Sequence, residues 1–170
     1  AFNPSRIQFD PATILVVDDI LDNRELIKQN FMNSGVEILQ AKNGQEAIDL
    51  YKNHAIDLIL MDIRMPVLDG YEAAKVIKSF DPNMPIIALT ASVMQDEYEK
   101  IEREYFDDYL RKPVLRNDLF QSLIKFLKHQ RVALEDVATS VEGEFLGNLK
   151  DKPVFSEVLF QALETLEPLF

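Results

Sequence analysis

Short aliphatic runs alternate with longer amphipathic stretches along the chain from Thr13 to about His129. Runs such as ILVV and LILM contain no polar residue, which is typical of strands buried on both faces of a parallel sheet. The stretches between the runs carry apolar residues at the three- and four-residue spacing of amphipathic helices. The pattern predicts strands near 13–18, 36–41, 56–61, 85–90 and 106–110, and helices near 22–33, 44–53, 70–79, 93–104 and 116–129.

This order is a strand followed by a helix, repeated five times. A helix between two strands brings those strands together in parallel through a right-handed crossover. The predicted fold class is therefore α/β, with a doubly wound five-stranded parallel sheet. Ligands of such sheets bind beyond the carboxyl ends of the strands, at a point where the strand order reverses.

The segments at the two ends of the chain do not follow this repeating pattern. Residues 1–11 are predicted to be an N-terminal linker, and residues 12–129 the folded domain. Residues 130–153 have no clean period, which predicts a linker or irregular structure. Residues 154–170 carry apolar residues at helical spacing, which predicts an amphipathic C-terminal helical extension. Because an exposed apolar helix face usually marks a binding site, this helix is expected to pack on the domain or on a second chain, as in a homodimer.

Composition narrows the classes of partner. The net charge is −11 and no helix rich in Lys or Arg stands out, so direct binding to nucleic acid is not expected. The sequence contains no cysteine, which excludes disulfides and thiolate metal sites. The longest nearly apolar stretch, Pro85 to Met94, is far shorter than the roughly 20 residues of a membrane-spanning helix, so no membrane contact by this segment is expected. We interpret the chain, which begins at Ala1, as a cytoplasmic piece of a longer protein; a membrane anchor elsewhere in that parent is compatible with this.

Four of the predicted strands end on residues that can handle a phosphoryl group. Asp18 and Asp19 follow the first strand, Asp62 the third, Thr90 the fourth and Lys112 the fifth. Because parallel strands end at the same edge of a sheet, these side chains are expected to meet there. A carboxylate can attack phosphorus and form an acyl phosphate if a cation neutralises the repulsion between the two anions.

Each of these residues also has an ordinary structural interpretation when taken alone. Asp18 or Asp19 could cap the first helix, and Asp69, which precedes a glycine, is expected to cap the third helix and to have no chemical role. His54 and His129 lie in no phosphotransfer motif and are assigned no role. The joint spacing of four strand ends favours the chemical interpretation.

Four segments carry a resemblance to a known family: ILVVDDILDNRELI, LILMDIRMPVLDGYEAAKVIK, PIIALTAS and FDDYLRKP. They resemble the receiver domain of response regulators in two-component signalling, over about residues 13–129. In detail they are most similar to the receivers of hybrid sensor histidine kinases. The resemblance implies a flavodoxin-like sheet with the strand order 2-1-3-4-5. In this order, the point at which the strand order reverses lies between the first and third strands.

The resemblance also implies a phosphoryl acceptor and a metal site. Asp62 is expected to be the catalytic nucleophile that accepts the phosphoryl group. Mg²⁺ is expected to be bound by Asp19, Asp62 and the backbone carbonyl of Arg64, with Asp18 holding one of the metal-bound waters.

Other matched positions are expected to bind the phosphoryl group or to respond to it. Lys112 and Thr90 would bind phosphoryl oxygens, and Pro113 would follow Lys112 through a cis peptide bond. Tyr109 matches an aromatic switch that moves inward as Thr90 moves. Tyr105 departs from the family pattern, because many relatives have a glycine there. Arg64 and Ser92, at variable family positions, are expected to affect phosphoryl lifetime.

The predicted function is a phosphoacceptor module of a two-component phosphorelay that signals by a change of shape. Its partner would be a histidine kinase, a phosphotransfer protein, or the kinase part of its own parent chain. It would not be a classical enzyme, although it would catalyse its own phosphorylation and slow dephosphorylation. One alternative is an aspartyl-phosphate phosphatase of the haloacid dehalogenase kind, but that class needs an acid two residues after the nucleophile, where this chain has Arg64. Another is a phosphorylation-independent interaction module.

Overall fold

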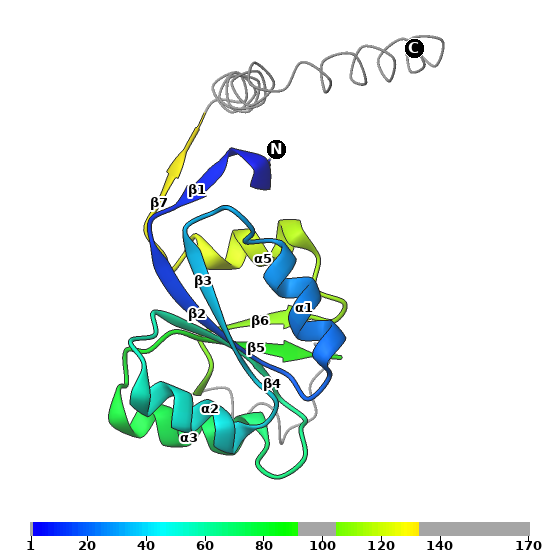
Figure 1. Cartoon of the computed structure of the whole chain (residues 1–170), viewed down its shortest axis with the longest axis vertical. Coiled ribbons are helices and arrows are strands. Elements are labelled where there is room, and N and C mark those ends of the chain that lie inside the picture. Colours follow the sequence, from blue (N-terminus) through cyan, green and yellow to red (C-terminus); the bar gives the residue numbers. More distant parts are fainter. Residues whose placement is uncertain (1, 92–104, 133–170) are drawn as a thin grey trace, which may run out of the picture. The chain divides into compact units, whose positions relative to one another are not determined.

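Five parallel strands form the central sheet of the computed structural model, which describes residues 2–91 and 105–132 (Figure 1). The strand order is β3-β2-β4-β5-β6. This is the order 2-1-3-4-5 of the five strands predicted from the sequence, so the predicted fold class is confirmed. The strands are β2 (Ala12–Val17), β3 (Val36–Ala41), β4 (Leu58–Asp62), β5 (Ile86–Thr90) and β6 (Asp108–Arg111).

Helices cover both faces of the sheet. Helices α1 (Leu21–Gln29) and α5 (Arg116–Leu123) lie on one face, and α2 (Gly44–Asn53) and α3 (Gly70–Phe80) lie on the other (Figure 1). Every residue of β4 and β5 is buried, because these strands lie inside the sheet and are covered on both sides. The uninterrupted aliphatic runs in the sequence have this physical cause.

The starts of α2 and α3 are fixed by side-chain caps. The Asn43 side chain accepts a hydrogen bond from the Glu46 amide at 2.8 Å, and Asp69 accepts one from the Glu72 amide at 2.9 Å. The predicted capping role of Asp69 is therefore confirmed. The glycine after Asp69 allows close approach, since a Cβ on Gly70 would overlap the backbone carbonyl of Asp62.

The N-terminal segment differs from the predicted linker. A short 3₁₀ helix, η1 (Pro4–Arg6), leads into strand β1 (Ile7–Phe9), which pairs antiparallel with β7 (His129–Arg131) in a separate two-stranded sheet. Phe9 is 5% exposed and its ring meets the rings of Phe31 and Phe120. The first residues of the chain therefore belong to the folded unit, which extends to Arg131.

Two helices end earlier than their apolar spacing predicts. Helix α1 ends at Gln29, and a turn through Asn33 and Gly35, both with positive φ, leads into β3. Helix α5 ends at Leu123 rather than near residue 129, because the chain there turns to pair with β1. Leu127 remains buried after the turn, which explains why the helical spacing continues beyond the helix.

The predicted helix at 93–104, Ser92 and nearly all of residues 130–170 lie outside the residues that the structure describes. Among the described helices, none combines the length and apolar character needed to cross a bilayer.

Candidate phosphoacceptor site

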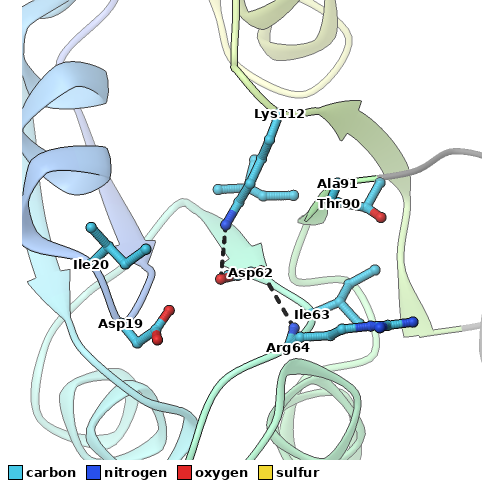
Figure 2. Close-up of a pocket in the computed structure, with 9 residues that line it drawn as sticks. Asp19, Ile20, Asp62, Ile63, Arg64, Thr90, Ala91 and Lys112 are labelled. Carbon is cyan, nitrogen blue, oxygen red and sulfur yellow. Dashed lines mark hydrogen bonds and ion pairs between the residues drawn. The ribbon is translucent and has the colours of Figure 1, made fainter.

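The carboxyl ends of four neighbouring strands surround one pocket of about 380 Å³ (Figure 2). Because β2 and β4 are adjacent and parallel, the residues that follow them arrive at the same edge of the sheet. Strands β5 and β6 complete the other side. The residues that line the pocket are Asp19, Ile20, Asp62, Ile63, Arg64, Leu89, Thr90, Ala91 and Lys112.

Three carboxylates from β2 and β4 lie together at this edge. Oxygen atoms of Asp18, Asp19 and Asp62 all lie within 4.8 Å of one another. Asp18 is completely buried and Asp62 is 6% exposed, whereas Asp19 is exposed to solvent. Such a set of hard oxygen donors matches the preference of Mg²⁺ for carboxylates.

The ammonium group of Lys112 lies between two of these carboxylates. Its Nζ is 2.9 Å from Asp62 Oδ2 and 2.9 Å from Asp18 Oδ2. Figure 2 shows the lysine reaching from the end of β6 toward Asp62. The peptide bond between Lys112 and Pro113 is cis, as the resemblance implies, and the backbone amide of Lys112 donates to the Thr90 carbonyl at 2.8 Å.

Burial and ion pairing act in opposite directions on the titration of this pair. Burial raises the pKa of Asp62, the negative charge of Asp18 adds to this effect, and Lys112 and the Arg64 amide only partly offset it. Burial alone would lower the pKa of Lys112, but its bonds to Asp62 and Asp18 raise that pKa above its ordinary value. Lys112 is therefore held in its charged form beside the two carboxylates.

Of the remaining predicted residues, Thr90 and Arg64 line the pocket and Tyr109 does not. Thr90 lies at the end of β5 and lines the pocket, with 9% of its surface exposed. Arg64 lines the pocket, and its backbone amide donates to Asp62 Oδ1 at 3.3 Å. Tyr109 is half-buried on β6, its ring 5.9 Å from that of Phe106, and is not among the residues that line the pocket.

Asn23 is a contributor that sequence reasoning missed. Its side-chain amide donates to both carboxylate oxygens of Asp18, at 3.3 and 3.2 Å, from the first turn of α1. Asp18 Oδ1 also accepts the Ile20 amide at 2.9 Å, so the carboxylate does not cap α1. The feature of the sequence that could have indicated Asn23 is its position: it is a polar residue five positions after Asp18, in a helix that begins next to the site.

A family model of the response regulator receiver domain matches residues 14–124. This match covers more than half of the chain and all of the pocket residues described above. The chain belongs to the response regulator receiver family. It is therefore a receiver module of the two-component phosphorelay class, and the predicted family is confirmed.

Relatives of this receiver include hybrid and sensor kinases. The chain is 39% identical over 107 residues to the autoinducer 1 sensor kinase/phosphatase LuxN of Vibrio harveyi, a match that covers 63% of this chain and 12% of LuxN. It is 33% identical over 138 residues to the sensor protein GacS of Pseudomonas syringae, covering 78% of this chain and 15% of GacS. The chain thus spans a small part of the length of these curated relatives.

Solved receiver structures share the fold. The receiver domain of the sensor histidine kinase PA1611 from Pseudomonas aeruginosa, solved with a magnesium ion in its active site cleft, is 34% identical with a TM-score of 0.63; the match covers 69% of this chain and 98% of that one. The receiver domain of Ssk1 from Saccharomyces cerevisiae, solved with the phosphotransfer protein Ypd1, is 32% identical with a TM-score of 0.63, covering 69% and 90%. The family match does not favour the phosphatase alternative, and the position two residues after Asp62 holds the exposed Arg64.

Proposed function

We propose that this receiver accepts a phosphoryl group from a phosphohistidine onto Asp62. The observation that supports this most strongly is the position of Asp62, whose carboxylate borders the pocket 2.9 Å from the Lys112 ammonium and beside two further carboxylates. No other described carboxylate combines a place in this pocket with direct contact to a cation.

The chemical step exchanges one bond to phosphorus for another. An oxygen of Asp62 attacks phosphorus, the new O–P bond forms as the N–P bond to the donor histidine breaks, and the electron pair of that bond returns to the imidazole nitrogen, which takes up a proton. The Lys112 ammonium and the Thr90 hydroxyl would bind oxygens of the phosphoryl group as it arrives. In a separate hydrolytic step, water would attack phosphorus, the O–P bond to Asp62 would break, and the Asp62 carboxylate would be regenerated with release of inorganic phosphate.

Mg²⁺ fits the residues present. Three clustered carboxylates, two of which contact the Lys112 ammonium, form an oxygen-rich, negatively charged site of the kind that this ion favours. Asp19, Asp62 and the backbone carbonyl of Arg64 would bind it, and Asp18 would hold one of its waters. When bound, the ion would neutralise the repulsion between the carboxylates and the incoming anion.

The phosphodonor would be a protein that carries the phosphohistidine. Ile20 lines the pocket and is 52% exposed, and Leu21 and Leu115 beside the ends of β2 and β6 are 55% and 59% exposed. These apolar side chains would meet a docking protein around the entrance to Asp62. A histidine kinase, a phosphotransfer protein or the kinase part of a longer parent chain would supply that surface.

Phosphorylation would be reported by Thr90 and Tyr109. In β5 and β6, Thr90 pairs with Arg111, two residues after Tyr109. A shift of Thr90 toward the phosphoryl group would free space that the Tyr109 ring could enter from its contact with Phe106.

Incubation with acetyl phosphate and Mg²⁺ tests the proposal. The wild-type chain should gain one acid-stable, base-labile acyl phosphate, which intact-mass measurement detects as one phosphoryl group, and should bind beryllofluoride in the presence of Mg²⁺. Asp62→Asn should gain none, whereas the control Asp57→Asn, at an exposed carboxylate before β4, should be labelled like the wild type. Labelling of Asp62→Asn at another carboxylate would refute the assignment. Catalytic turnover of a general phosphatase substrate would favour the haloacid dehalogenase alternative, and failure of the wild type to bind beryllofluoride would favour an interaction module.

A further inference from the structure

The guanidinium group of Arg24 joins the end of β2 to the neighbouring strand β3. From the first half of α1, its Nη1 donates to the backbone carbonyl of Asp18 at 2.7 Å, and its Nε donates to Gln40 Oε1 at 3.0 Å. Gln40 in turn donates from its Nε2 to Glu25 Oε1 at 3.1 Å, which fixes the direction of the amide. One side chain thus binds an acceptor just after β2 and an acceptor within the adjacent strand β3.

These contacts hold the backbone on both sides of Asp19. The Asp18 carbonyl, in the peptide group before Asp19, accepts from Arg24, and the Ile20 amide, in the peptide group after it, donates to Asp18 Oδ1 at 2.9 Å. The Asp19 side chain itself is exposed, yet its carboxylate lies within 4.8 Å of those of Asp18 and Asp62. Its position therefore depends on the backbone that carries it.

An arginine suits this task better than a lysine. The planar guanidinium presents several N–H groups in fixed directions, so it can bind the Asp18 carbonyl and the Gln40 amide oxygen at the same time. A lysine ammonium lacks this fixed fork and would not hold both acceptors in the same geometry.

We propose that Arg24 is a positioning residue of the metal site, which acts on Asp19 through the Asp18 carbonyl and is itself oriented by Gln40. This inference rests on the proposed role of Asp19 as a Mg²⁺ ligand. Residues that orient metal ligands without touching the metal typically change metal affinity by about 10–100-fold when they are replaced. The same order of effect is expected at Arg24.

Calorimetric titration of the full 170-residue chain with Mg²⁺ alone tests the inference. Arg24→Lys should raise the Kd for Mg²⁺ by about 10-fold or more. Gln40→Met should raise it less, because the Asp18 carbonyl keeps its donor. The double variant should bind Mg²⁺ as Arg24→Lys does, since Gln40 acts only through Arg24.

A matched control separates positioning from stability. Lys78 also bridges two segments, with its Nζ 2.6 Å from the Met84 carbonyl and 2.7 Å from Asp107 Oδ2. Lys78→Met should lower the free energy of unfolding in urea and leave the Kd for Mg²⁺ unchanged. Arg24→Lys and Gln40→Met should change the Kd itself.

Two results would overturn the inference, and they are distinguishable from failure of the proposed function. If Arg24→Lys folds and its Kd for Mg²⁺ is within twofold of the wild-type Kd, Arg24 is only structural and the inference is wrong. If Arg24→Lys does not fold, an unchanged Kd for Mg²⁺ in Gln40→Met overturns the inference instead. If the wild type binds no Mg²⁺, or if Asp19→Ala binds it equally well, the metal site fails and the inference fails with it.

Discussion

Lys112, which follows β6, and Asp18, which follows β2, form an ion pair at 2.9 Å in which the carboxylate has no exposed surface. The same ammonium lies 2.9 Å from Asp62. One cation therefore compensates two buried negative groups, and the energetics of the site depend on it.

Replacement of Lys112 should destabilise the protein. In Lys112→Met, Asp18 and Asp62 would lose their shared cation, and removal of one partner from a buried ion pair costs about 3 kcal/mol or more. Urea unfolding in EDTA measures this loss, and saturating Mg²⁺ should recover part of it because the metal also neutralises the carboxylates. The control Lys75→Met, at an exposed position of α3, should change stability little. Equal stability of the two variants would show that Lys112 does not compensate the buried charge.

Mg²⁺ should stabilise the folded chain through Asp19 and not through bulk charge. A ligand that binds only the folded state at 100 times its Kd adds about 2.7 kcal/mol, which appears as a higher melting temperature. Asp19→Ala should remove most of that shift. Asp69→Ala should lower the starting stability by about 1 kcal/mol, because a helix cap is lost, and keep the shift. Loss of the shift in both variants would contradict a site-specific metal.

Gly70 should be far less tolerant of a methyl group than Gly35. A Cβ at position 70 would overlap the Asp62 carbonyl and lie 2.9 Å from Ile63 Cα, so β4 and α3 would have to separate beside the acceptor. Gly35 has φ +77° and open space around it, so Gly35→Ala should cost only about 1 kcal/mol of backbone strain. Urea unfolding should show a larger loss for Gly70→Ala, accompanied by slower labelling with acetyl phosphate. Similar losses would mean that the backbone near Asp62 can relax.

Asp108 should stabilise the fold in a pH-dependent way. Its burial opposes ionisation, but hydrogen bonds from Ser122 at 2.6 Å and Lys125 at 2.9 Å outweigh this and lower the pKa of Asp108 below its ordinary value. A folded-state pKa below the unfolded one means that the stabilisation is complete above about pH 4, the unfolded pKa, and is lost as the pH falls through the folded pKa.

Asp108→Asn should therefore lower the free energy of unfolding by about 1.5–3 kcal/mol at pH 7, the range for hydrogen bonds to charged groups. The difference from the wild type should shrink below pH 4. Asp49→Asn, at an exposed carboxylate of α2, serves as the control and should cost little at pH 7. A difference for Asp108→Asn that stays constant from pH 7 to pH 3 would contradict the role of its charge.

The sequence alone determined the five parallel strands, the four helices among them that the structure describes, and the edge at which Asp19, Asp62, Thr90 and Lys112 meet. This was possible because local apolar spacing defines each element, and the end of a parallel strand defines where its next side chain lies. Asp69 as a cap was also readable, since a cap acts within four residues.

Only the tertiary structure decided which distant groups complete the site and the fold. Asp18 is fully buried, accepts a hydrogen bond from Asn23 and is paired with Lys112. Lys112 lies 94 positions after Asp18 in the chain, so no local pattern could indicate this pair. The pairing of β1 with β7 likewise joins two segments whose local patterns indicated a linker and the end of a helix. Such contacts depend on how elements pack in space, which the periodicity of a single segment does not encode.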